Sequence, residues 1–74
     1  LKGATLTGAD FSFATLTEAN FGGAILTEAN LRYATLINAD FRETTLTGVN
    51  LNESVLMGAN FNGVTLTDVI VGWS

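Results

Sequence analysis

Seven carboxylates are the side chains of this chain that could do acid–base chemistry or hold a hard cation. They are Asp10, Glu18, Glu28, Asp40, Glu43, Glu53 and Asp68. The sequence has no His and no Cys, so no imidazole or thiolate can act beside them as base, nucleophile or soft metal ligand. Asp40 and Glu43 share a repeat, but a lone carboxylate pair on a solvated face is usually only solvated, and the sequence does not combine a nucleophile, a base and an oxyanion donor. We therefore expect no enzyme activity, no catalytic, cofactor or metal residues, and no small-molecule substrate.

Other ligand classes are excluded by charge and spacing. Lys2, Arg32 and Arg42 are the only cations and the net charge is -4, which argues against binding a nucleic-acid backbone. The Gly-Gly-x-Gly-x-Asp spacing of calcium-binding β-helix repeats is missing. No apolar run approaches the roughly 18 residues of a membrane span, so we expect no membrane insertion. The composition assigns no compartment and leaves the cytoplasm, the periplasm and the thylakoid lumen open.

A five-residue period runs through the whole sequence. All ten leucines, from Leu1 to Leu66, share one phase of this period, and all nine alanines lie two residues before that central position. On an α-helix a step of five residues turns by about 140°, which would scatter the leucines over the surface. On a straight strand, successive leucines would alternate between faces. The large residues share one interior only if the chain turns once per repeat, which predicts a β-solenoid.

A second, ten-residue rhythm predicts the number of sides. The residue before each central position alternates between Asn or Asp and a β-branched residue. In a three-sided coil, Asn or Asp of one coil would stack on a β-branched residue of the next. In a four-sided coil, residues 20 positions apart stack, so that each residue lies on one of the same kind. Four sides also bring Phe21, Phe41 and Phe61 into one column. We therefore predict four repeats per coil and just under four coils, in a single domain of residues 1–74.

The repeat A-[D/N/T]-[L/F]-x-x resembles that of the pentapeptide-repeat family. It stands in the sequence as Ala9-Asp10-Phe11, Ala19-Asn20-Phe21, Ala29-Asn30-Leu31 and Ala59-Asn60-Phe61. The resemblance covers the whole chain. It implies an all-β fold, a right-handed quadrilateral parallel β-helix, with the central residue and the small residue two before it pointing inward. Most members of the family have no catalytic site.

Two inward positions and the two ends depart from this pattern. Thr44 and Ser54 occupy small inward positions, so their hydroxyls need backbone partners inside. The chain begins at Leu1 in the middle of a repeat, so we expect a fragment or processed part of a longer chain. At the other end the pattern stops at Val71, and we expect Trp73 to fold over or beside the last coil. The first coil is expected to leave an open edge.

Three groups of outward residues are candidate binding surfaces. One side carries two threonine columns: Thr5, Thr7, Thr27, Thr45, Thr47, Thr65 and Thr67, with Ile25. Strand propensity explains these columns, although they are similar locally to the Thr-x-Thr arrays of ice-binding β-helices. The opposite side carries an apolar patch: Thr35, Ile37, Val55 and Met57. One corner column contains Phe13, Tyr33, Glu53 and Trp73, and aromatic rings on neighbouring coils can stack across about 4.8 Å.

These observations predict a structural or protein-interaction module, a rigid scaffold or spacer. The candidate interaction surface consists of Ile37, Val55, Met57, Phe13, Tyr33 and Trp73. The expected partner is another protein or a second copy stacked end to end. The repeat type resembles that of bacterial, especially cyanobacterial, members and their plastid-lumen relatives. Two alternatives remain: a DNA-mimicking gyrase or topoisomerase inhibitor, for which the acidic residues are few and scattered, and an ice-binding module.

Overall fold

Each five-residue repeat folds as a short extended segment followed by a tight turn. In the first turn the N–H of Ala4 donates to the carbonyl oxygen of Leu1 at 3.1 Å, and the φ angle of Gly3 is +70°. A positive φ at the third residue of a four-residue turn is typical of type II turns. The third residue of every turn from Gly3 to Asp68 has this left-handed conformation in the computed structural model, which describes residues 1–69. The chain therefore turns once per repeat.

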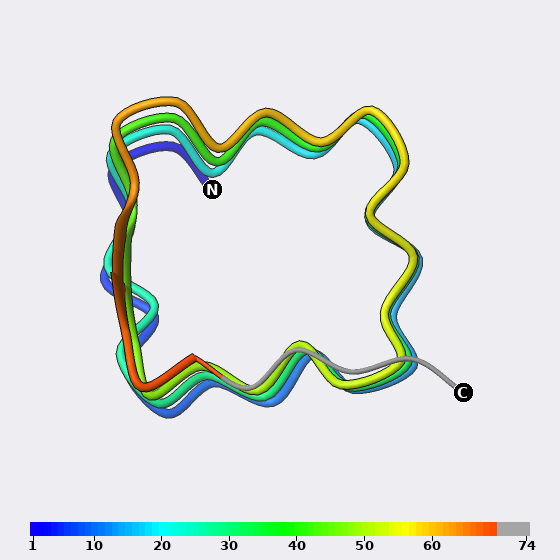
Figure 1. The fold of residues 1–74 in the computed structure, drawn as a ribbon, viewed down its shortest axis with the longest axis horizontal. Helices are drawn as coiled ribbons and strands as arrows, with labels where there is room; N and C mark the ends of the chain where they lie inside the picture. Colours follow the sequence, from blue (N-terminus) through cyan, green and yellow to red (C-terminus); the bar gives the residue numbers. More distant parts are fainter. Residues whose placement is uncertain (70–74) are drawn as a thin grey trace.

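Residues twenty positions apart lie side by side in adjacent coils. Thr5 pairs with Ile25, and Ile25 pairs with Thr45, both in parallel orientation. The N–H of Leu6 donates to the carbonyl of Ile25 at 2.7 Å, and the N–H of Ile25 donates to the carbonyl of Ala4 at 2.9 Å. The coils follow one another around a four-sided path (Figure 1). The predicted right-handed quadrilateral β-helix is confirmed, whereas the number of coils in the whole chain stays a prediction.

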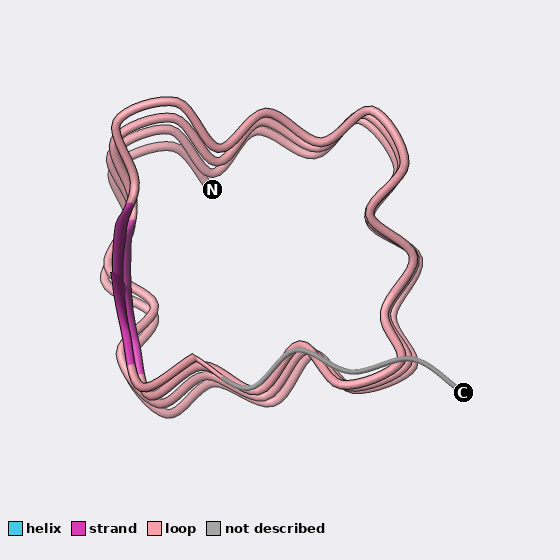
Figure 2. Cartoon of the chain, viewed as in Figure 1, coloured by secondary structure: helices cyan, strands magenta, loops and turns pink. Residues whose placement is uncertain are grey.

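Two short strands mark one side of the square. They are β1 (Thr45–Thr47) and β2 (Thr65–Thr67), which pair in parallel with Leu46 opposite Leu66. Both lie on the left-hand side of the view in Figure 2. This side, formed by residues 5–7, 25–27, 45–47 and 65–67, is called the Thr side below. Residues 1–69 contain no helix with the length and hydropathy of a membrane span.

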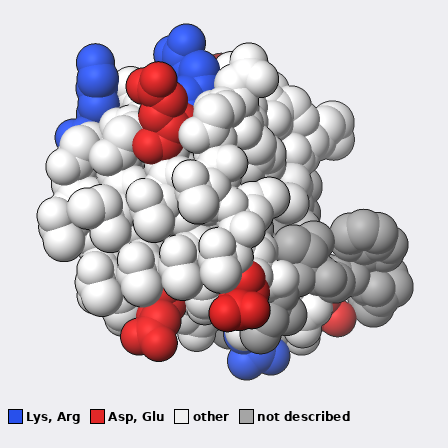
Figure 3. Space-filling view, turned by 60° about the vertical axis from the view of Figure 1, so that its left-hand side comes forward, with Lys and Arg blue, Asp and Glu red and all other residues white. Residues whose placement is uncertain are grey.

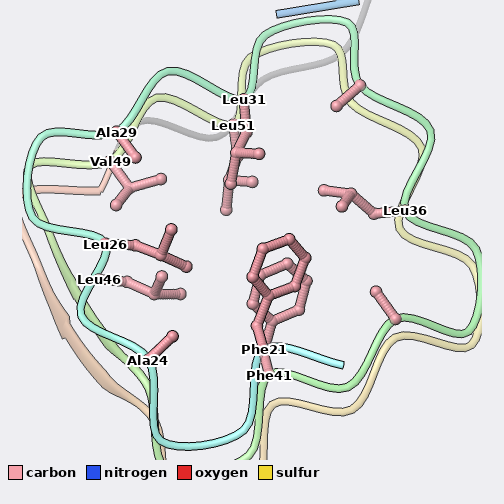
Figure 4. Packing of buried hydrophobic residues seen from close by; sticks show 12 residues of the cluster. Phe21, Ala24, Leu26, Ala29, Leu31, Leu36, Phe41, Leu46, Val49 and Leu51 are labelled. Atoms are coloured by element: carbon pink, nitrogen blue, oxygen red, sulfur yellow. The ribbon is translucent and has the colours of Figure 1, made fainter. Parts of the chain in front are cut away.

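The large central residues fill the inside of the square (Figure 4). Phe21 and Phe41 are fully buried, and their rings stack with centroids 4.9 Å apart. The ring of Phe61 continues the column at 5.0 Å from Phe41. Leu36 and Leu46 are also fully buried, on opposite sides of the square. The inward position of these residues is as predicted from the period.

The two inward hydroxyls have backbone partners, as expected. Thr44 is buried, and its Oγ1 donates to the carbonyl oxygen of Phe41 at 2.7 Å. Ser54 is partly buried, and its Oγ donates to the carbonyl of Leu51 at 2.8 Å. Each hydroxyl thus bonds within its own turn, which removes the free-energy penalty of an unpaired polar group in the core.

Burial decreases towards both ends of the described residues. The side chains of Leu1 and Leu66 are 51% and 59% exposed, whereas Leu36 in a middle coil is fully buried. The reason is geometric, because the residues of an end coil are covered by a neighbouring coil on one side only. The predicted position of Trp73 lies outside the described residues.

Candidate interaction surface

Two opposite sides of the square use their polar residues for structure. Asn20 Oδ1 accepts a hydrogen bond from the N–H of Gly22 at 2.9 Å, and Asp40 Oδ1 accepts one from the N–H of Arg42 at 3.0 Å. The same bond is made by Asp10, Asn30, Asn50 and Asn60. Asn and Asp are favoured in turns because their side chains form this bond to the backbone two residues on. The Asn/Asp half of the ten-residue rhythm is therefore explained by local turns rather than by ligand binding.

Two carboxylates on these sides have additional partners. Asp40 forms an ion pair with Arg42, with Nη2 and Oδ2 2.7 Å apart. The side-chain hydrogen bond from Arg42, followed by its backbone N–H, lowers the pKa of Asp40 below its ordinary value. The hydroxyl of Ser12 donates to Asp10 at 2.6 Å, and this bond, followed by that of the Ser12 N–H, lowers the pKa of Asp10 in the same way. Both carboxylates are therefore stabilised in the charged form, which is unsuitable for a general acid near neutral pH.

A shallow polar groove of about 500 Å³ lies beside Arg42. Gly22, Gly23 and Gly63 line it and contribute no side chains, while Glu43 adds a second carboxylate. Asp40 and Lys2 also line the groove, which contains no hydroxyl or thiol side chain. Within residues 1–69, no group of acidic side chains is arranged to hold a metal ion.

The side opposite the Thr side becomes more apolar from the first coil to the third. Its outward residues are Thr15 and Thr17, then Thr35 and Ile37, then Val55 and Met57. Thr35 pairs with Val55, and the N–H of Asn38 donates to the carbonyl of Met57 at 2.9 Å. Val55 and Met57 are 43% and 69% exposed, and Ile37 is half-buried. This side, formed by residues 15–17, 35–37 and 55–57, is called the apolar side.

A stacked aromatic pair lies at the corner where the apolar side begins. The rings of Phe13 and Tyr33 are nearly parallel, at an interplanar angle of 5°, with centroids 4.9 Å apart. The guanidinium carbon of Arg32 lies 5.4 Å from the centroid of the Tyr33 ring, within the range of a cation–π interaction. Phe13 is 74% exposed and Tyr33 is 40% exposed. The pair thus presents a large apolar surface outside the core.

The two groups that were predicted separately from the sequence follow one another along the coil. Phe13 and Tyr33 stand at the left-handed turn positions that precede Thr15 and Thr35 of the apolar side. Of the six predicted surface residues, Phe13 and Tyr33 thus lie at a corner, and Ile37, Val55 and Met57 lie on the side that begins there, while Trp73 lies outside the described residues.

The Thr side has a different surface. Figure 3 turns this side towards the viewer: uncharged side chains stand in rows across its middle, and charged side chains lie at its margins. Thr5 and Thr67 are exposed, whereas Thr45 and Thr47 in β1 are half-buried. Ile25 is the one outward residue of this side that is not a threonine.

Comparisons with known proteins agree with this architecture. A family model described as pentapeptide repeats matches residues 1–32 and 34–70 in eight copies. A crystal structure of a pentapeptide repeat protein from the Arabidopsis thaliana thylakoid lumen is 41% identical, with a TM-score of 0.91, over 92% of this chain and 47% of that one. A second, from Nostoc PCC 7120, is 32% identical, with a TM-score of 0.63, over 85% of this chain and 56% of that one. The chain thus spans about half the length of these solved relatives. No curated protein matches it.

Proposed function

The chain belongs to the pentapeptide-repeat family, and on this basis we propose that it is a non-enzymatic scaffold that binds a protein partner through its apolar side and aromatic corner. The partner would present an apolar segment to the exposed side chains of Met57 and Val55 and to the ring of Phe13. The square β-helix would serve as the rigid support that fixes the spacing of these side chains.

The observation that carries this proposal is the exposure of the aromatic pair. The rings of Phe13 and Tyr33 stack outside the core and are 74% and 40% exposed. Their turn positions have positive φ angles, as do the equivalent positions of the other repeats, where glycine or a polar residue stands. An aromatic ring at such a position gains nothing from burial in the core, and an exposed apolar cluster is typical of an interaction site.

The composition of the surface supports a protein partner. Aromatic residues, Met and Arg are enriched in protein–protein interfaces, while Glu, Asp and Lys are depleted. The apolar side and its corner contain Phe13, Tyr33, Met57 and Arg32, and Glu53 is the carboxylate that continues the aromatic column. An exposed apolar patch with a polar rim is the usual sign of such an interface.

A photo-crosslinking experiment tests the proposal. A photoreactive phenylalanine analogue replaces Met57 on the apolar side or Thr47 at the equivalent repeat position of the Thr side. The scaffold model predicts one discrete crosslinked product from position 57 in an extract of the source cells, and its loss when Phe13→Ser and Tyr33→Ser are added. A product at twice the mass of the chain would identify a second copy as the partner. Equal, diffuse crosslinking from both positions would contradict the proposal.

The DNA-mimic alternative is not supported by the distribution of charge. A mimic of the DNA backbone needs rows of carboxylates, whereas adjacent coils place Glu43 between Gly23 and Gly63, and Glu28 between Gly8 and Gly48. No corner column of residues 1–69 is therefore uniformly acidic. A gyrase supercoiling assay with the isolated chain should accordingly show no inhibition.

A further inference from the structure

The Thr side is a second outward surface, separate from the surface of the proposed function. Its two outward columns are Thr5, Ile25, Thr45 and Thr65, and Thr7, Thr27, Thr47 and Thr67. The coils are in strict register here, with Thr45 opposite Thr65 and Thr47 opposite Thr67 in β1 and β2. Only on this side do the coils of residues 1–69 form strands of three residues.

The threonine hydroxyls of this side are available to an external partner. Within residues 1–69, none of the seven makes a side-chain hydrogen bond to another protein group. Thr44, which points inward, differs because its Oγ1 donates to the carbonyl of Phe41. The outward hydroxyls therefore keep both their donor and their acceptor capacity for solvent.

The margins of the Thr side contain five glycines. The corner column on one edge contains Gly3, Gly23 and Gly63, interrupted by Glu43. The column on the other edge contains Gly8 and Gly48, alternating with Glu28 and Asp68. Neither outward column of the Thr side contains a charged residue, and Figure 3 shows the uncharged area between the charged margins.

These features determine the kind of partner that fits. Neighbouring coils repeat every ~4.8 Å, and alternate residues of a strand are about 6.7 Å apart, so hydroxyls and methyls form a two-dimensional grid. Each hydroxyl contact is weak, and the contacts add up only if the partner is rigid and meets many of them at once. The partner must therefore be flat, periodic and uncharged. Crystalline polysaccharide fits less well, because the side has no aromatic ring on which a sugar could stack.

We propose that the Thr side binds the surface of ice. The hydroxyls would take the places of water molecules in the outer layer of the crystal, while the methyl groups between them limit the disordered hydration that opposes adsorption. Ile25 interrupts the grid at one position, so Ile25→Thr should strengthen binding.

Thermal hysteresis and ice recrystallisation, measured on the isolated chain, test this proposal. Wild-type protein should shape ice crystals and inhibit their recrystallisation. Thr47→Lys places a charge in the middle of the grid and should abolish most of this activity. Asn52→Lys is the matched control, because Asn52 is half-buried, occupies the equivalent repeat position on a neighbouring side and belongs to neither proposed surface. Circular dichroism checks that both variants keep the wild-type fold.

Three outcomes would overturn the proposal. The first is an absence of both activities in folded wild-type protein. The second is an equal loss in the Thr47→Lys and Asn52→Lys variants. The third is retention on crystalline cellulose or chitin without any effect on ice, which would assign the Thr side to a polysaccharide. None of these outcomes concerns the apolar side, so the protein-binding proposal is tested independently by the crosslinking experiment.

Discussion

The Thr side and the apolar side are joined by the same kind of parallel bridges between coils and have nearly the same interior, but they have different outer surfaces. Leu46 under the Thr side and Leu36 under the apolar side are both fully buried. On both sides main-chain groups join the coils: the N–H of Leu26 donates to the carbonyl of Thr45, and the N–H of Leu36 to that of Val55. Outside, one side carries threonines and the other Ile37, Val55 and Met57. The inward residues and the main chain thus determine the fold, and the outward residues are free to determine binding.

The largest effects should come from inward substitutions, and they should be equal on the two sides. Leu36→Ala and Leu46→Ala each leave a cavity in a fully buried position and should lower the free energy of unfolding by roughly 2–5 kcal/mol. Leu1→Ala should lower it much less, because Leu1 is half-exposed at an end coil. Urea unfolding measures all three. Equal losses for Leu1→Ala and Leu36→Ala would contradict the stacked-coil structure.

Substitutions at the corner of the apolar side should have smaller effects. Tyr33→Val keeps the φ of 58°, which is least favourable for a β-branched residue, and also removes the aromatic stack, so it should lower the free energy of unfolding by at least about 1 kcal/mol. Tyr33→Gly removes the backbone strain but also the aromatic stack, worth about 0.5–1.5 kcal/mol, so the two effects should nearly cancel. Thermal unfolding compares the variants. A loss for Tyr33→Gly as large as that for Tyr33→Val would refute the assigned turn conformation.

The fold was predictable from the sequence because one signal is repeated in every coil. The phase shared by the leucines fixes the interior, and the like-on-like stacking of Phe21, Phe41 and Phe61 fixes four sides. The candidate surface was predictable only in parts. Period and phase say which residues point outward, but they do not say that the rings of Phe13 and Tyr33 stack at the corner before the apolar side. Stacking geometry, exposure and the hydrogen bonds of Asp40 depend on side-chain conformation, which a period does not encode.

Exchanging outward residues between the two sides should leave stability almost unchanged. Thr47→Val and Ile37→Thr alter half-buried positions that make no side-chain hydrogen bond in residues 1–69. Each should change the free energy of unfolding by about 0.5 kcal/mol or less, as is usual for surface substitutions. Urea unfolding of the double variant measures the sum. A decrease of more than about 2 kcal/mol in the free energy of unfolding of the double variant would show that the outward residues also stabilise the fold.

The smallest effect concerns pH and belongs to the two sides that carry Asn and Asp. The folded pKa values of Asp10 and Asp40 are lowered from 3.8. Their contribution to stability is therefore present above the unfolded pKa and is lost as the pH falls through the lower folded pKa. Asp10 is exposed and Asp40 is half-buried, so solvent screens both groups and the contribution is small. The double variant Asp10→Asn with Asp40→Asn keeps the side-chain oxygen that accepts the backbone hydrogen bond of each turn. It should lose less stability than the wild type as the pH falls below about 4. An unchanged dependence of stability on pH would show that these two carboxylates do not contribute.

The most direct test of the twenty-residue stacking uses pairs of introduced cysteines, since the natural chain has none. Residues 37 and 57 lie in adjacent coils, where the N–H of Asn38 meets the carbonyl of Met57 at 2.9 Å. Ile37→Cys with Met57→Cys should therefore form an intramolecular disulfide, because adjacent coils are within its reach. Ile37→Cys with Thr47→Cys, ten residues apart on opposite sides, should stay reduced under the same mild oxidation. Disulfide formation in the second pair but not in the first would contradict the four-sided coil and both surfaces built on it.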